Sequence, residues 1–236
     1  MQYSTFAAID IGSYDVILEI FEISKKQGIR SVDKICHRME LGKDTYTLGK
    51  IRPEMEEELC RVLADFVRIM EGYRVDAYRA MASSAISEAA NSLYVLGKIR
   101  QLTGLSVTVL SNSEQRFLGY KALAAMEDNF NKIIEKGTAI LDLDGGSFQI
   151  SLFDKDALVT TQNIRMGSLR IRERLAGIQS ETEHYEEMVE ELIWNEVSSF
   201  KKMYLKDRKI ENIMLIGDVF TDSVYQNIEE KTTKII

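Results

Sequence analysis

Two short acidic turns are the first features of this chain that could carry chemistry. In each, an aspartate closes an apolar run and is followed by glycine and serine, in Asp10-Ile11-Gly12-Ser13 and in Asp142-Leu143-Asp144-Gly145-Gly146-Ser147. Backbone N–H groups in such a turn can cradle a phosphate, and the aspartate can hold Mg²⁺ directly or through water. A single turn of this kind is common in hairpins for conformational reasons. Two at the same place in a repeated pattern favour a phosphate site.

The elements that would position these turns also occur twice. We predict three strands around the first turn, over residues 3–9, 16–23 and 29–36, and three around the second, over 138–141, 148–153 and 157–164. Further strands are expected at 77–82, 107–110 and 212–216, and helices at 53–73, 84–104, 112–129, 182–208 and 220–228. The pattern predicts an α/β protein with two lobes, 1–130 and 131–236, facing each other across a cleft.

Composition narrows the classes of partner. The 30 Lys and Arg residues against 37 Asp and Glu residues give a net charge of −7, which argues against a broad basic face for nucleic acid. Two cysteines and two histidines give neither a disulfide framework nor a multi-histidine metal site. No apolar run reaches the ~18 residues of a membrane span, and the start of the chain lacks a signal peptide. We expect a cytoplasmic protein without nucleic-acid or membrane partners, and we leave a homodimer open.

Six segments, in order along the chain, resemble the exopolyphosphatase/guanosine pentaphosphate phosphohydrolase (Ppx/GppA) family. They are FAAIDIGS at 6–13, RMELG at 38–42, RAMASSAISEAAN at 79–91, LSNSEQRFLGY at 110–120, DLDGGS at 142–147 and MGSLR at 166–170. The resemblance implies two ribonuclease-H-like lobes of the actin, Hsp70 and sugar-kinase type, with the active site in the cleft between them. It also implies hydrolysis of terminal phosphoanhydrides in inorganic polyphosphate or guanosine pentaphosphate.

The same resemblance assigns roles to residues of this chain. Asp10 and Asp142 would hold Mg²⁺, Glu114 or Gln115 would place the attacking water, and Arg170 would supply positive charge. The phosphate would be cradled by backbone amides of the two turns, at Gly12, Ser13, Gly145, Gly146 and Ser147. Ser87 stands where the family has an arginine that contacts phosphate.

Several site positions depart from the family pattern. By alignment, Gln115 takes the place of the catalytic glutamate, with Glu114 one residue earlier, and a glutamine amide cannot usefully accept a proton. Ser87 removes a bidentate cation, and Asp144 puts a carboxylate where the family has glycine. The other departures are Tyr14, Asp15, Gln149 and the segment IGDVF at 216–220, where the family has a turn rich in glycine and threonine. Two functions therefore stay open, a phosphoanhydride hydrolase and a catalytically impaired relative that binds a phosphate or nucleotide ligand or a protein partner.

Overall fold

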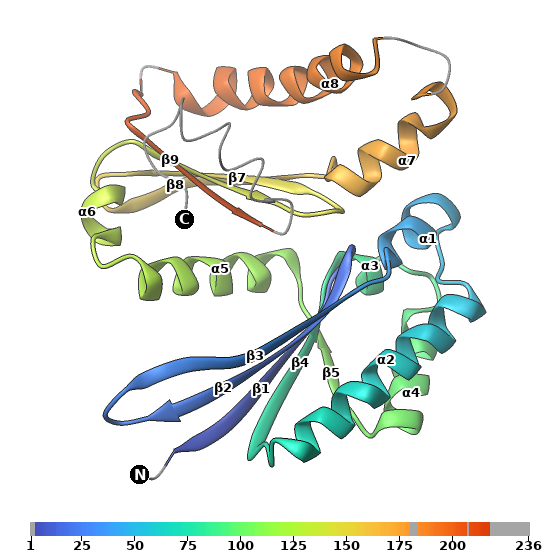
Figure 1. Ribbon diagram of the computed structural model, residues 1–236. Coiled ribbons are helices and arrows are strands. Elements are labelled where there is room, and N and C mark those ends of the chain that lie inside the picture. Colours follow the sequence, from blue (N-terminus) through green and yellow to red (C-terminus); the bar gives the residue numbers. More distant parts are fainter. Residues whose placement is uncertain (1–2, 180–183, 207, 218–236) are drawn as a thin grey trace. The chain divides into compact units, whose positions relative to one another are not determined.

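The chain divides into two compact units, Met1–Ser113 and Glu114–Ile236. The structure is a computed structural model and describes residues 3–179, 184–206 and 208–217 (Figure 1). The division differs from the predicted lobes in the assignment of one helix, α5 (Asn112–Met126). Tyr120 and Leu123 on this helix pack into a core of the second unit, and α5 therefore groups with that unit from Glu114 onward.

The first unit is built on a five-stranded sheet with the order β3-β2-β1-β4-β5. The strands β1 (Ser4–Ile11), β2 (Asp15–Ser24) and β3 (Gly28–Arg38) form an antiparallel meander, as the sequence predicts. β4 (Ala77–Ala82) and β5 (Val107–Val109) add to it in parallel. Alternate residues of β1 are buried, so Asp10 lies on the face opposite to that of Ile9 and Ile11.

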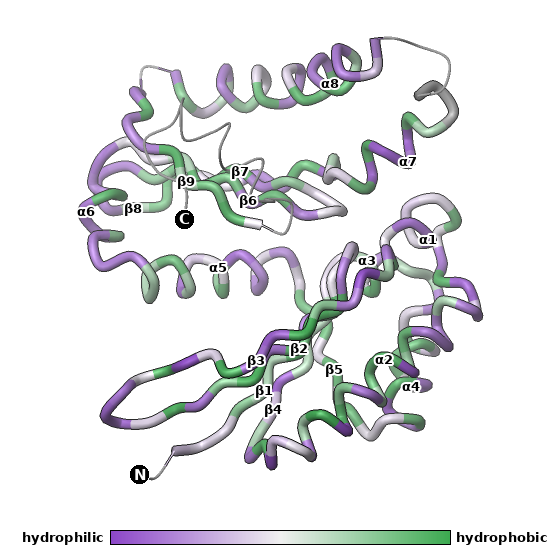
Figure 2. The backbone as a smooth tube through the Cα atoms, in the orientation of Figure 1, coloured by the Kyte–Doolittle hydropathy of each residue, from purple (hydrophilic) through white to green (hydrophobic). Residues whose placement is uncertain are grey.

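Helices α2 (Pro53–Gly72) and α4 (Ser92–Thr103) cover the apolar face of this sheet (Figure 1). α2 begins where predicted, with Pro53 in its first turn and acidic residues that suit the positive end of the helix dipole. In Figure 2 the tubes of α2 and α8 (Tyr185–Phe200) alternate between hydrophobic and hydrophilic residues, as expected for helices with one apolar face.

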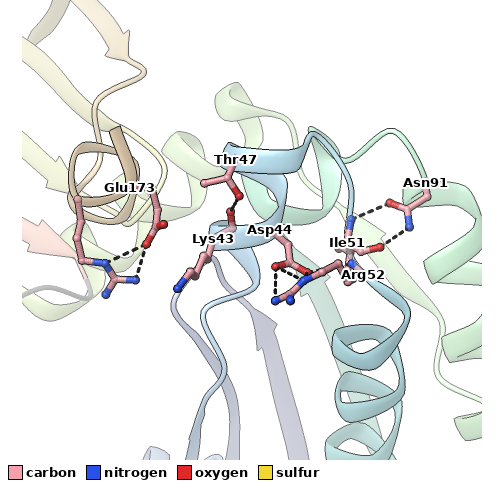
Figure 3. Close-up of polar contacts among 8 residues, drawn as sticks. Lys43, Asp44, Thr47, Ile51, Arg52, Asn91 and Glu173 are labelled. Carbon is pink, nitrogen blue, oxygen red and sulfur yellow. Dashed lines mark hydrogen bonds and ion pairs between the residues drawn. The ribbon is translucent and has the colours of Figure 1, made fainter. Parts of the chain in front are cut away.

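One predicted helix, 84–104, is divided in two. The structure has a short α3 (Ser84–Ser87) and then α4, because Asn91 has a tertiary role between them. Its side chain accepts a hydrogen bond from the Ile51 amide at 3.0 Å and donates to the Ile51 carbonyl at 2.8 Å (Figure 3). These bonds fix the loop that leads into α2, and the Asn91 backbone is not helical.

The second unit repeats the strand pattern of the first. Its sheet has the order β8-β7-β6-β9, with β6 (Thr138–Leu143), β7 (Phe148–Asp154) and β8 (Ala157–Ile164) antiparallel and β9 (Asn212–Gly217) parallel to β6. One core joins this sheet to α5 and α6 (Phe130–Ile134), and another joins it to the end of α8 and the turn that follows.

Other helix limits also differ from the prediction. The predicted helix 182–208 is α8, which begins at Tyr185 and passes into a π-helical turn, Lys201–Leu205. The predicted helix 112–129 ends at Met126, before the separate α6. The structure adds α1 (Leu41–Leu48), α6 and α7 (Ser168–Gln179), which the sequence analysis did not predict. The predicted helix 220–228 lies outside the described residues. Within the described part of the chain, no helix combines the length and apolar character that membrane crossing requires.

Candidate functional site

The first acidic turn links β1 to β2 and is fixed by backbone hydrogen bonds. The Gly12 amide donates to the Asp15 carbonyl at 3.0 Å and closes the turn. The Gly42 amide, in the first turn of α1, donates to the Ser13 carbonyl at 2.9 Å. Gly12 and Ser13 are buried, whereas Asp10, just before them on β1, is exposed. The start of α1 therefore holds the backbone that the family resemblance assigns to phosphate.

Side chains around the first turn are engaged with one another. Ser13 Oγ lies 2.7 Å from the Tyr46 hydroxyl and 3.1 Å from Ser84 Oγ, at the start of α3. Ser87, the last residue of α3, is exposed, and its hydroxyl donates to the Ser84 carbonyl at 3.4 Å. Ser13 and Ser87 thus both contact Ser84.

Tyr14 and Asp15, which follow Ser13 and depart from the family pattern, both contact Arg38. Arg38 Nε donates to the Asp15 carboxylate at 3.2 Å, and the Arg38 guanidinium lies 4.4 Å from the centre of the Tyr14 ring. The hydrogen bond that Arg38 donates to Asp15 raises the pKa of Arg38 above its ordinary value. Arg38 therefore offsets the negative charge that Asp15 adds beside the first turn.

The second acidic turn, between β6 and β7, repeats the backbone bond of the first. The Asp144 amide donates to the Ser147 carbonyl at 3.0 Å, which is the same i to i+3 relation. The beginning of α7 packs on this turn. The Arg170 amide donates to the Gly145 carbonyl at 3.1 Å, and Arg170 Nε donates to the Gly146 carbonyl at 2.9 Å. The structure thus brings Arg170 together with Gly145 and Gly146, and its role toward phosphate stays a prediction.

Two details make the second turn unlike a simple anion cradle. The Gly145 amide donates at 2.6 Å to the carboxylate of Asp144, one of the family departures. Gly167 lies so close that a Cβ there would be 2.3 Å from the Asp144 carbonyl oxygen and 2.4 Å from Gly145 carbonyl atoms. The turn therefore depends on a glycine at 167 and already satisfies one of its amides with its own carboxylate.

Helix α5 crosses the face of the second sheet on which Asp142 lies. A Cβ on Gly119 would be 3.7 Å from Ile216 Cδ1, and Ile216 is the β9 neighbour of Asp142. Neighbouring residues in a parallel pair point to the same face. Farther along the helix, the Tyr120 hydroxyl donates to Ser151 Oγ at 2.6 Å. α5 and Asp142 therefore share one face of the second unit.

This geometry separates the two candidate catalytic residues. Gln115 lies four residues before Gly119 and so shares its side of the helix, and it is half-buried. Glu114 is exposed and lies about 100° around the helix from Gln115. Glu114 also has an interaction within the protein. The side of α5 that carries Gly119 therefore also carries an amide, at Gln115.

The predicted magnesium carboxylates lie one in each unit. Asp10 is exposed on β1 and Asp142 is half-buried on β6. In the part of the chain that the structure describes, no three His, Cys, Asp or Glu residues gather as a ligand cluster. Mg²⁺ commonly keeps several waters and binds through one or two carboxylates together with substrate phosphates. A single carboxylate before each turn is compatible with this mode of coordination, and the magnesium ion stays a prediction.

Two contact residues had no signal in the sequence. Tyr46 on α1 contacts Ser13, although no motif includes it and its helix was not predicted. Asn163 on β8 donates to Ser147 Oγ at 3.1 Å, and only the register of β7 with β8 brings it there. Motif spacing finds residues near each other in the chain, whereas these two reach the turns through tertiary packing.

Comparison with known proteins identifies the family. The crystal structure of the Aquifex aeolicus Ppx/GppA family member superposes with a TM-score of 0.71 over 99% of this chain and 72% of that one, at 21% identity. The bifunctional 3-dehydroquinate synthase/phosphatase of Fusobacterium nucleatum is 22% identical over 95% of this chain, and exopolyphosphatase 1 of Mycobacterium leprae is 26% identical over 61%. The chain spans 34% and 41% of the lengths of these two curated relatives.

The α/β fold with two sheets and the predicted family are both confirmed by these comparisons. The predicted cleft between the two units stays a prediction. The sequence profile of the Ppx/GppA phosphatase family matches residues 19–235, which is nearly the whole chain. The chain belongs to the Ppx/GppA phosphatase family.

Proposed function

We propose that this protein binds the terminal phosphate of inorganic polyphosphate or guanosine pentaphosphate and hydrolyses its phosphoanhydride bond. One observation carries the proposal: the same turn, closed by the same backbone bond of 3.0 Å, follows the first strand of both units. An aspartate precedes each turn, at Asp10 and Asp142. Paired turns of this kind, in a chain of a phosphatase family, support a ligand with several phosphate groups.

In the proposed reaction, a water oxygen attacks the terminal phosphorus and the phosphoanhydride P–O bond breaks. The shortened phosphate chain leaves with the bonding electrons, and the water proton passes to a carboxylate. Glu114 is the carboxylate that the resemblance offers for that proton, and the Gln115 amide would orient the water. Mg²⁺ held through Asp10 or Asp142 would neutralise charge on the phosphate oxygens.

The substrate class rests on charge and on the relatives. Backbone amides of the turns and the Arg170 guanidinium are groups that bind phosphate oxygens. One curated relative, from Mycobacterium leprae, is named an exopolyphosphatase. Such substrates fit a cytoplasmic protein, and the free cysteines Cys36 and Cys60 fit the same reducing compartment.

Phosphate release from the purified protein tests the proposal. Long-chain polyphosphate and guanosine pentaphosphate are incubated separately with the protein and Mg²⁺, beside the variants Asp142→Ala and Glu114→Gln. Release by the native protein that exceeds release by both variants is the expected result. Release equal to that of Asp142→Ala would show that the chain is not a hydrolase of these substrates.

A second function, binding without hydrolysis, is favoured by one specific observation. Gln115 aligns with the family's catalytic glutamate and lies on the same side of α5 as Gly119, and its amide cannot take up the proton that hydrolysis releases. Thermal melting with each ligand separates the two functions, because a ligand at 100 times its dissociation constant stabilises the native state by about 2.7 kcal/mol. A raised melting temperature without phosphate release supports this second function. An unchanged melting temperature with every phosphate ligand would contradict both.

A further inference from the structure

Three hydroxyl groups from three separate elements form a closed ring beside the first turn. Ser13 Oγ lies 2.7 Å from the Tyr46 hydroxyl, the Tyr46 hydroxyl lies 2.9 Å from Ser84 Oγ, and Ser84 Oγ lies 3.1 Å from Ser13 Oγ. We call this set the hydroxyl ring. Ser13 comes from the turn after β1, Tyr46 from α1 and Ser84 from the start of α3. The ring therefore joins the turn to both short helices.

The ring holds the Ser13 side chain inside the first unit. Each hydroxyl carries one proton, so the three hydroxyls can supply the three bonds of the ring. Ser13 has no exposed surface, Ser84 is 8% exposed and Tyr46 is half-buried. The Ser13 side chain is therefore held by internal contacts.

The helix that carries Tyr46 is itself firmly attached. Asp44, 2% exposed, accepts a hydrogen bond from the Arg52 amide at 2.9 Å and forms an ion pair with the Arg52 guanidinium at 2.8 Å (Figure 3). The Thr45 hydroxyl donates to the Ala85 carbonyl at 2.7 Å and ties α1 to α3. The Tyr46 hydroxyl is therefore presented to Ser13 from a fixed position.

We propose that Tyr46 and Ser84 are positioning residues, which hold the first turn in its phosphate-binding conformation through the Ser13 hydroxyl. The functional part of this inference rests on the proposed function, because it takes the turn to be a phosphate site. Its structural part does not: the ring restrains the backbone at Gly12 and Ser13 whether or not a ligand is present. Loss of one ring hydroxyl loosens the turn without removing any group that touches phosphate.

Tyr46→Phe tests the inference, because it removes the hydroxyl and keeps the aromatic ring. Two quantities are measured on the full chain: the dissociation constant for tripolyphosphate by calorimetry, and the hydrogen exchange of backbone amides in 11–15 and 39–42. We expect binding to weaken about fivefold to tenfold and these amides to exchange faster by a similar factor, as expected for one lost hydrogen bond. Ser84→Ala should act in the same direction, and Ser84→Thr should restore both quantities.

Thr103→Val is the matched control. It removes a half-buried hydroxyl of the same unit, which donates to the Ile99 carbonyl at 2.7 Å and accepts from the Leu105 amide at 3.1 Å, away from the ring and from α1. We expect it to lower the melting temperature to an extent similar to Tyr46→Phe, with binding and exchange at the turn changed less than about twofold.

The outcomes separate this inference from the proposed function. Equal effects of Thr103→Val and Tyr46→Phe on binding, or unchanged exchange in Tyr46→Phe, would overturn the inference while phosphate binding stands. If the native protein binds no tripolyphosphate, the proposed function fails. In that case faster exchange at the turn in Tyr46→Phe alone still supports the ring, and unchanged exchange overturns it.

Discussion

The carboxylate of Asp144 accepts a hydrogen bond from the amide of Gly145 at 2.6 Å, inside the second turn, which the family resemblance assigns to phosphate. A carboxylate oxygen is the protein group that most resembles a phosphate oxygen in charge and in accepting hydrogen bonds. The second turn therefore presents an anion of its own to its own amide. An incoming phosphate meets this negative charge and must also compete for the Gly145 N–H.

Replacing Asp144 should strengthen phosphate binding. Asp144→Gly removes the charge and the competing oxygen, whereas Asp144→Asn removes the charge and keeps an acceptor. Hydrogen bonds to charged groups are worth about 1.5–3 kcal/mol, so we expect Asp144→Gly to lower the dissociation constant for tripolyphosphate about tenfold. Asp144→Asn should fall between this variant and the native protein. Calorimetric titration measures the change, and affinity that is unchanged in both variants would show that phosphate does not approach this turn.

Adding one methyl group at Gly167 should disrupt the second turn. A Cβ there would be 2.3 Å from the Asp144 carbonyl oxygen, which belongs to rigid backbone. We expect Gly167→Ala to destabilise the protein by about 2 kcal/mol or more and to weaken phosphate binding. Gly97→Ala in α4 is the control, because a Cβ at Gly97 meets nothing within 4 Å. That change should stabilise by about 0.5–1 kcal/mol. Denaturant unfolding measures the free energy of unfolding of both variants. An equal change in Gly167→Ala and Gly97→Ala would contradict the close approach at Gly167.

The buried carboxylate of Asp44 should contribute far more to stability than an exposed one. Asp44→Ala leaves the Arg52 amide and guanidinium without their acceptor, and we expect a loss of about 2–3 kcal/mol. The ion pair between Arg30 and Glu22 is the comparison, because Arg30 is 66% exposed. Glu22→Ala should cost less than about 1 kcal/mol. Urea unfolding of the two variants gives the difference, and similar losses would mean that Asp44 does not hold α1.

The sequence predicted the strands better than the helices. The three strands around each turn follow from the alternation of apolar residues, and β8 has the limits that the sequence predicts. The helix α1 could not be predicted, because its eight residues, Leu41–Leu48, have little apolar periodicity and are held by Asp44 and Thr45. The break between α3 and α4 depends on the two hydrogen bonds between Asn91 and Ile51, which are 40 positions apart in the chain. Local propensity does not contain such contacts.

In the candidate site, too, the sequence predicts the local motifs but not the contacts made through tertiary packing. The motifs locate both turns, and the structure adds that Arg170 donates a hydrogen bond to the second, at the Gly146 carbonyl. Spacing alone left Glu114 and Gln115 as alternatives, and the structure adds that Gln115 is half-buried whereas Glu114 is exposed. The motif also marks Asp144 as a departure but does not show that its carboxylate reaches the next amide. Side-chain direction depends on packing between elements, which a single sequence does not record.

The last prediction concerns restored hydrolysis. The combined change Ser87→Arg, Gln115→Glu and Asp144→Gly returns a cation, a proton acceptor and an unobstructed turn. General-base catalysis is typically worth about 10²–10⁴-fold, so the triple variant should release phosphate from polyphosphate well above the native rate. Gln115→Glu alone should do little, because it adds negative charge to a site that still lacks its arginine. The measurement is phosphate release by each variant with Mg²⁺, beside a melting curve that shows the fold is kept. A folded triple variant that neither binds nor hydrolyses polyphosphate would mean that these three positions are not what limits catalysis.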